Sequence, residues 1–151
     1  MILEHRKSKS LSRLALARFA GRAQRAAKLK GEVTILLTGD QEIRELNAQF
    51  RHKDKATDVL SFPADPALSA RQAGDIAISL ETARAQAREM GHDLSTEVKV
   101  LILHGMLHLA GYDHEADHGQ MRRQEAKLRA QLRLPAGLIE RASDSGRSRL
   151  C

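Results

Sequence analysis

The chain is poor in several residue types whose presence would indicate particular classes of protein. Its single cysteine, Cys151, excludes a disulfide-stapled scaffold and a zinc cluster built from thiolates. Aromatic residues make up only 3 %, with no tryptophan, one tyrosine and three phenylalanines, so the core must be aliphatic. No apolar run approaches the roughly 20 residues that a membrane-spanning helix needs. We therefore expect a cytoplasmic protein without a membrane partner, and any bound metal must be held by histidine or carboxylate side chains.

Positive charge is concentrated at the beginning of the chain. The 25 lysines and arginines exceed the 19 acidic residues, which gives a net charge of +6 over 151 residues. Residues 1–30 alone contain nine basic side chains and one acid, Glu4, so the remaining residues are slightly acidic as a group. Because non-specific affinity for nucleic acid rests on phosphate contacts, we expect the basic first helix to be a docking surface for RNA or the ribosome.

Hydrophobic periodicity predicts short strands that alternate with helices. A first amphipathic helix is expected over about residues 11–28, with Ser10 or Ser12 as its cap. The apolar runs at residues 33–38, 57–62 and 75–79 are typical of buried strands. Further helices are predicted after Asp40, which we expect to act as a cap, and over residues 80–90, 95–110 and 116–132.

Two histidines interrupt the apolar helix that is predicted from Ser95. His104 and His108 lie four residues apart, so their side chains share one face of that helix. We expect Gly111 to end the helix, because glycine takes a left-handed conformation at no steric cost, and His114 follows three residues later. Burying two unpaired imidazoles would cost several kcal/mol. The pattern HxxxHxxGxxH therefore predicts a metal site of three imidazoles with an open fourth position, the arrangement of a catalytic zinc ion.

Several alternatives remain open for this site. His118, one helical turn beyond His114, is a rival third ligand, and three imidazoles also suit nickel or cobalt. The spacing equals that of the metzincin peptidases, but Gly105 stands where those enzymes carry a catalytic glutamate. Peptide hydrolysis without that base lacks its proton carrier, which disfavours a peptidase unless Glu81 or Glu115 supplies the base.

The segment HGMLHLAGYDH, residues 104–114, resembles the signature of the YbeY family of zinc-dependent endoribonucleases, which act in ribosomal RNA maturation and ribosome quality control. Residues 46–63, residues 74–79, and the pair Met121 and Glu125 agree with the family in order and spacing. The resemblance covers about residues 10–133. It implies an α+β fold in which a small mixed β-sheet packs on helices, with the histidine helix at the centre.

The resemblance also sets the expected domain limits. One catalytic domain is predicted over residues 11–135, after a basic segment (1–10) and before a flexible tail (136–151). The family usually opens with an extra strand, but residues 1–10 of this chain are mostly charged. We therefore expect that strand to be shortened or missing.

The resemblance implies zinc on His104, His108 and His114, and a functional arginine at Arg51. A guanidinium suits the second role, because its rigid fork matches phosphate oxygens, although a run such as residues 51–55 is more often a solvated loop. The implied activity is cleavage of single-stranded RNA near the 3′ end of small-subunit ribosomal RNA, with ribosomal particles as partners. The nucleophile is either metal-bound water or a ribose 2′-hydroxyl. The alternatives are a non-catalytic ribosome-assembly factor with a structural zinc and a metzincin-like peptidase.

Overall fold

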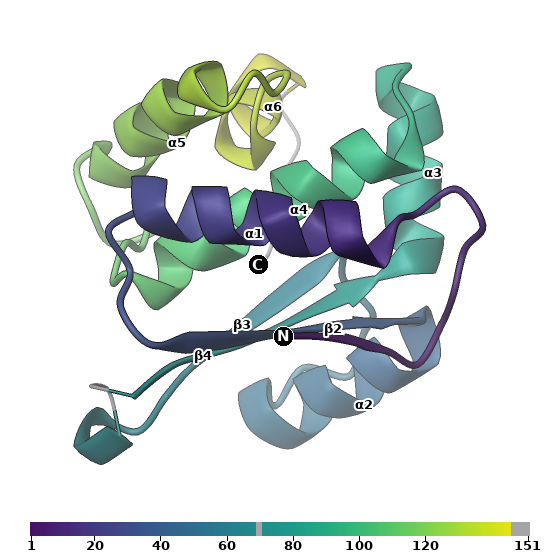
Figure 1. Ribbon diagram of the computed structural model, residues 1–151, viewed down its shortest axis with the longest axis horizontal. Helices are drawn as coiled ribbons and strands as arrows, with labels where there is room; N and C mark the ends of the chain where they lie inside the picture. Colours follow the sequence, from purple (N-terminus) through teal and green to yellow (C-terminus); the bar gives the residue numbers. More distant parts are fainter. Residues whose placement is uncertain (69–70, 146–151) are drawn as a thin grey trace.

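The computed structural model describes residues 1–68 and 71–145, which form a sheet of four strands with helices on both faces (Figure 1). This architecture confirms the predicted α+β class with a small mixed sheet. The elements in chain order are β1 (Ile2–Glu4), α1 (Arg13–Ala26), β2 (Glu32–Thr38), α2 (Asp40–Arg51), β3 (Val59–Pro63), a 3₁₀ turn (Pro66–Leu68), β4 (Gln72–Ser79), α3 (Leu80–Met90), α4 (Leu94–Leu109), α5 (Gln120–Gln131) and α6 (Leu138–Ser145).

The sheet has the strand order β1-β2-β4-β3. Strands β1, β2 and β4 are parallel, whereas β3 runs antiparallel to β4 at the edge. In this register Ile35 of β2 lies between Ile2 of β1 and Ile76 of β4. The first strand is therefore present but only three residues long, and residues 2–4 belong to the sheet rather than to a separate segment.

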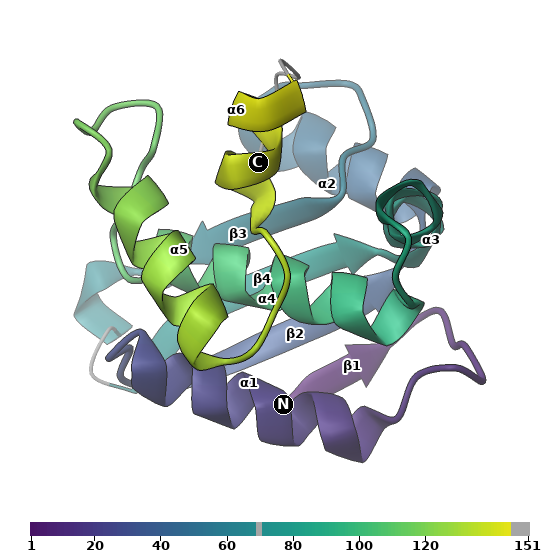
Figure 2. The same ribbon diagram turned by 90° about the horizontal axis from the view of Figure 1, so that it is seen from above.

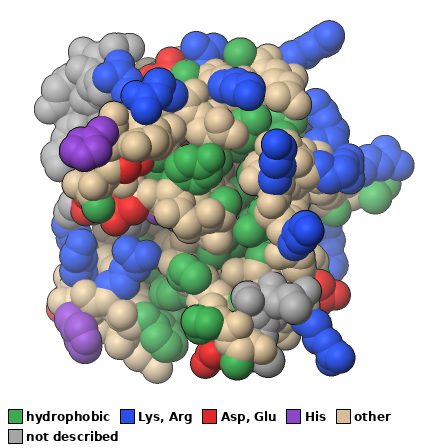
Figure 3. Space-filling view, turned by 90° about the vertical axis from the view of Figure 1, so that its left-hand side faces the viewer, with side chains coloured by type: hydrophobic (Ala, Val, Ile, Leu, Met, Phe, Trp, Pro, Cys, Tyr) green, Lys and Arg blue, Asp and Glu red, His purple; other side chains and the backbone are tan. Residues whose placement is uncertain are grey.

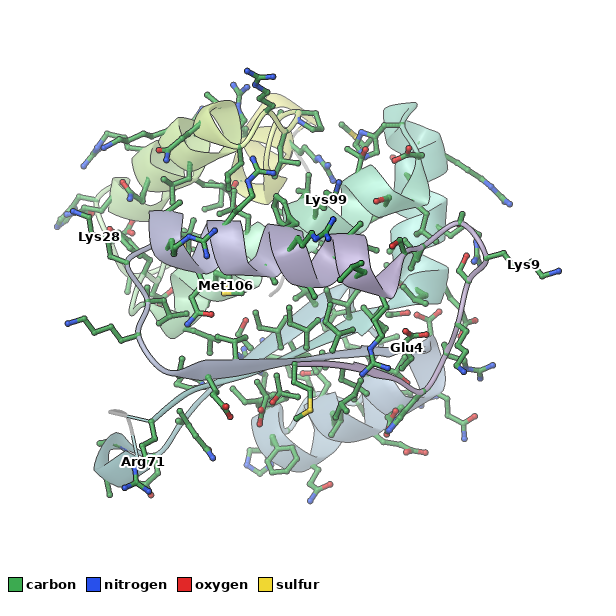
Figure 4. All side chains as sticks on the ribbon, viewed as in Figure 1. Glu4, Lys9, Lys28, Arg71, Lys99 and Met106 are labelled. Carbon is green, nitrogen blue, oxygen red and sulfur yellow. The ribbon has the colours of Figure 1, made fainter. Side chains whose placement is uncertain are left out.

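Helix α4 lies at the centre of the larger helical layer, over β3 and β4, with α1 beside it and with α5 and α6 on its side away from the sheet (Figures 1 and 2). Twelve of its sixteen residues are buried, as expected for a helix that is apolar on most sides. Met106 lies between α1 and the sheet and is 0 % exposed (Figure 4). Lys99 of the same helix reaches outward to α1, where its ammonium lies 5.8 Å from the centre of the Phe19 ring.

Helix α2 covers the opposite face of the sheet (Figure 1). A small apolar cluster of Ile43, Leu60 and Ala77 joins the helix to β3 and β4. Asp40 does not cap this helix as expected, because Gly39 is the N-cap and Asp40 is the first helical residue. Its carboxylate instead accepts hydrogen bonds from the hydroxyls of Ser79 and Thr82, which joins the beginnings of α2 and α3.

The carboxyl-terminal region from residue 136, which we expect to be a flexible tail, contains a helix. Residues 138–145 form α6, and Leu138 is 1 % exposed. The guanidinium of Arg141 donates two hydrogen bonds, of 2.9 and 3.0 Å, to the fully buried carboxylate of Glu97 in α4. Composition does not reveal this ion pair, which binds a polar segment to the core. The expectation for residues 146–151 lies outside the described residues.

In the part of the chain that the structure describes, no helix is both long enough and apolar enough to cross a membrane.

Candidate metal centre

The carboxyl-terminal half of α4 brings two imidazoles together. His104 and His108 lie one helical turn apart, and their Nε2 atoms are 3.1 Å from each other. His104 is 0 % exposed, whereas His108 is partly buried and faces a pocket. The two side chains therefore lie on the same face of α4, as their spacing predicts.

Each of these imidazoles is oriented through its other nitrogen. His104 Nδ1 lies 2.7 Å from Oε2 of Glu125, and His108 Nδ1 lies 3.1 Å from the carbonyl oxygen of Tyr112. Because an ionised carboxylate and a carbonyl only accept hydrogen bonds, both Nδ1 atoms carry the proton and both Nε2 atoms present a lone pair. Two lone pairs that face each other at this distance repel, unless a proton or a cation lies between them.

Gly111 brings the third histidine back to this pair. It follows the helix with φ +100°, a left-handed conformation that favours glycine, and the chain then returns at His114. The rings of His104 and His108 both lie 5.9 Å from the His114 ring, centroid to centroid. Nδ1 of His114 is buried and has no hydrogen-bond partner among the described residues.

The three side chains can hold one metal ion, because their candidate ligand atoms lie within 4.8 Å of one another. His118, the rival third ligand, is exposed and is not part of this group. Burial, reinforced by the neighbouring His104 and His114, lowers the pKa of His108 to about 4. His108 is therefore neutral at physiological pH, which is the state that binds a metal.

Gly105 occupies the helix position beside the first ligand, and the structure explains why it carries no side chain. A Cβ at this position would lie 2.9 to 3.1 Å from three side-chain carbons of Ile76 in β4. The backbone carbonyl of Gly105 also accepts a 3.3 Å hydrogen bond from the hydroxyl of Ser61 in β3. The helix therefore approaches the sheet too closely here to leave room for a glutamate.

A pocket of about 290 Å³ opens beside the histidines, and Arg51 lines it together with His108 and His114. Arg51 is the last residue of α2, and its guanidinium donates a 3.0 Å hydrogen bond to the backbone carbonyl of Ser61. Through this contact the Arg51 side chain passes the edge strand β3 and reaches the face of the sheet on which the histidines lie. The structure thus brings all four predicted site residues together, although they come from three separate segments.

One part of this site is not predicted from the sequence. Glu125 was assigned only to the last helix, whereas its buried carboxylate contacts both His104 and the backbone N–H of Ile139 at 2.9 Å. The spacing of Glu125, twenty-one residues after His104 and on another helix, carries no local signal of such a contact.

The fold and the site together define a class: α+β proteins whose central helix carries a three-histidine site able to hold a metal ion. A sequence model of the family described as "Endoribonuclease YbeY" matches residues 2–133. The chain belongs to this family.

Individual relatives agree with this assignment. The endoribonuclease YbeY of Koribacter versatilis is 50 % identical over 143 residues, which cover 95 % of this chain and 92 % of the relative. That of Solibacter usitatus is 53 % identical over 133 residues, which cover 87 % of each chain. The solution structure of TM1509 from Thermotoga maritima is similar with a TM-score of 0.59 and 28 % identity, over 98 % of this chain and 96 % of that one.

Proposed function

We propose that this protein is a zinc-dependent endoribonuclease that cleaves single-stranded RNA during ribosomal RNA processing and ribosome quality control. The observation that carries the proposal is the pocket that contains both the histidine cluster and the guanidinium of Arg51. A phosphodiester needs cationic groups around the oxygens on which charge develops, and this pocket offers the guanidinium of Arg51 beside histidines that can hold a metal cation. The family to which the chain belongs and the names of its relatives support RNA as the substrate.

In this proposal His104, His108 and His114 hold the ion, and Arg51 binds a phosphate oxygen. A bound zinc ion supplies Lewis acidity and lowers the pKa of a bound water. Glu125 keeps the proton of His104 on Nδ1, and the Tyr112 carbonyl does the same for His108, so that both Nε2 atoms are free to ligate. The nucleophile in this proposal is either a water molecule or a ribose 2′-hydroxyl.

The exposed side of α1 is a further contact surface in this proposal. Helix α1 contains no acidic residue, and Arg18, Arg22 and Arg25 are all exposed on it. We expect neutralisation of these three arginines to weaken RNA binding and to flatten its dependence on salt, with the zinc content unchanged. RNA binding measured over a series of salt concentrations tests this separation, and loss of zinc in the triple variant would contradict it.

Neither alternative is favoured by a specific observation. A peptidase needs a general base, and the position of the metzincin glutamate is filled by Gly105 packed on Ile76. A non-catalytic assembly factor with a structural zinc has no need of an arginine in the metal pocket, where Arg51 is found.

A cleavage assay with matched variants tests the proposal. Wild-type protein, His108→Ala and Arg51→Ala are compared on single-stranded, double-stranded and ribosomal RNA, with zinc content measured for each. We expect cleavage of single-stranded RNA by the wild type, loss of both zinc and activity in His108→Ala, and loss of activity with zinc retained in Arg51→Ala. Equal residual activity in all three proteins would assign the cleavage to a contaminating nuclease.

A further inference from the structure

Phe50 is an exposed aromatic side chain next in sequence to Arg51, which lines the metal pocket. The chain contains only three phenylalanines, and this one is 58 % exposed at the end of α2, directly before Arg51. Covering this apolar surface with a ligand would be favourable. An exposed aromatic ring at this position can stack against a ligand that has a flat, apolar surface.

The Phe50 ring is supported from the sheet. It packs against Phe62 with ring centroids 5.5 Å apart and an interplanar angle of 63°, a favourable edge-to-face arrangement. Phe62 belongs to β3 and lies between Ser61 and Pro63, both of which line the metal pocket. Because neighbouring residues of a strand point to opposite faces, the Phe62 ring packs with the apolar cluster on the α2 side, whereas Ser61 faces α4. The aromatic pair therefore lies across the edge strand β3 from the pocket, and Arg51, the residue after Phe50, lines that pocket.

A basic loop adjoins this aromatic pair. Lys53 and Lys55 are exposed, and neither is in an ion pair among the described residues. The acid between them, Asp54, is neutralised by two hydrogen bonds of 2.7 and 3.2 Å from Arg44. The loop thus presents uncompensated positive charge, and basic side chains surround the rim of this end of the molecule (Figure 3).

The backbone of the loop is held in place before any ligand binds. Asn47 is 2 % exposed, and its side-chain amide donates a 2.9 Å hydrogen bond to the carbonyl of Lys55. The backbone N–H of Lys53 donates to the carbonyl of Asn47 at 3.2 Å, and His52 takes a left-handed conformation that turns the chain. A preorganised loop loses little conformational entropy when it binds.

We propose that Phe50 is a stacking platform for one nucleobase of single-stranded RNA, with Lys53 and Lys55 as contacts for the neighbouring phosphates. An aromatic ring beside basic side chains is the arrangement that binds single strands, because every base has a flat face and every nucleotide a phosphate. The inference rests on the proposed function and deepens it. It gives the preference for single strands a physical cause, since the bases of a duplex are already stacked and paired.

Abasic substitution in the RNA tests the platform. The substrate is a ten-nucleotide single-stranded RNA with one known cleavage site, used intact and with one base removed at each position in turn. The metal-loaded full chain is assayed for initial-rate kcat/KM as wild type, Phe50→Ala, Phe50→Leu and Phe50→Trp. Met90→Ala is the matched control, because Met90 is an exposed apolar side chain at the end of α3, a helix that has no RNA contact in this proposal.

We expect removal of the base at one position to lower the kcat/KM of the wild type about 5- to 140-fold, the range that stacking on an aromatic side chain gives. Phe50→Ala and Phe50→Leu are expected to show a similar loss on intact RNA and no further loss on the abasic RNA. Phe50→Trp and Met90→Ala should behave as the wild type, and circular dichroism and zinc content should be unchanged throughout.

The other outcomes overturn the inference in distinguishable ways. A wild type that cleaves no single-stranded RNA refutes the proposed function, and the platform with it. A wild type that cleaves RNA while Phe50→Ala keeps the full abasic penalty refutes the platform alone. Full activity in Phe50→Leu would assign the exposed ring to an apolar contact, such as a protein partner, instead of a base.

Discussion

The substitution Glu125→Gln tests how the protein prepares His104 for a metal ion. Glu125 is 1 % exposed and accepts two hydrogen bonds, from Nδ1 of His104 at 2.7 Å and from the backbone N–H of Ile139 at 2.9 Å. Glutamine has the same shape but only one acceptor oxygen. If that oxygen serves Ile139, the amide N–H₂ faces His104 and forces its proton onto Nε2, the nitrogen that faces His108 at 3.1 Å.

We expect Glu125→Gln to weaken metal binding more than it destabilises the fold. Loss of a hydrogen-bonding partner behind a metal-binding histidine weakens metal affinity roughly 10- to 100-fold, which corresponds to about 1.4 to 2.7 kcal/mol. Zinc affinity is measured by competition with a chelator, and cobalt absorption reports the ligand geometry. Glu115→Gln is the matched control, because Glu115 lines the same pocket, is exposed and contacts no histidine through its carboxylate in any described hydrogen bond. We expect its affinity to stay within about twofold of the wild type.

The reasoning is refuted by a Glu125→Gln protein that folds normally and binds zinc as tightly as the wild type. An equal loss of affinity in Glu115→Gln would also refute it, because the effect would then come from negative charge near the pocket and not from the hydrogen bond.

Three further predictions concern stability, each measured as a free energy of unfolding in urea. Without metal, the free energy of unfolding should fall by up to roughly 3 kcal/mol between pH 6.5 and pH 4. The pKa of His108 is lowered to about 4 in the folded protein, so the unfolded chain binds a proton first as the pH falls. A free energy of unfolding that stays constant over this pH range would contradict the prediction. Gly105→Glu should lower the free energy of unfolding by roughly 3 kcal/mol or more, because the added side chain collides with β4. It should also produce no peptidase activity. A variant of unchanged stability would contradict the close packing of α4 on β4. Arg141→Met should lower the free energy of unfolding by about 3 kcal/mol, because it leaves the carboxylate of Glu97 buried without its guanidinium. Arg44→Met, at an exposed pair, should have a much smaller effect, and equal effects would refute the anchoring of α6.

The sequence predicts those features that depend on neighbours along the chain. The spacing of His104 and His108 predicts their shared face, and Gly111 predicts the turn that returns His114, because helix geometry and the conformational freedom of glycine are local. Tertiary contacts decide the rest. The buried pair of Arg141 and Glu97, forty-four residues apart, converts an apparently polar tail into α6.

The residues at which strands and helices begin also depend on tertiary contacts. Composition predicts a strand from residue 75, but β4 begins at Gln72, where it extends alongside β2. The helix predicted from residue 116 is α5, which begins at Gln120. The carboxylate of Asp117 accepts hydrogen bonds from the backbone N–H groups of Gly119 and Met121, and these bonds hold the preceding residues in a turn. Such competition between side chain and backbone is decided by the three-dimensional path of the loop.

Titration of the metal-free protein with zinc, with cleavage of single-stranded RNA followed at each addition, tests the central claim most directly. We predict no cleavage without metal, a rate that rises in proportion to zinc up to one equivalent and then stays constant, and no response in His108→Ala. A rate that is independent of zinc, or that keeps rising well beyond one equivalent, would contradict an RNA-cleaving site built on His104, His108 and His114.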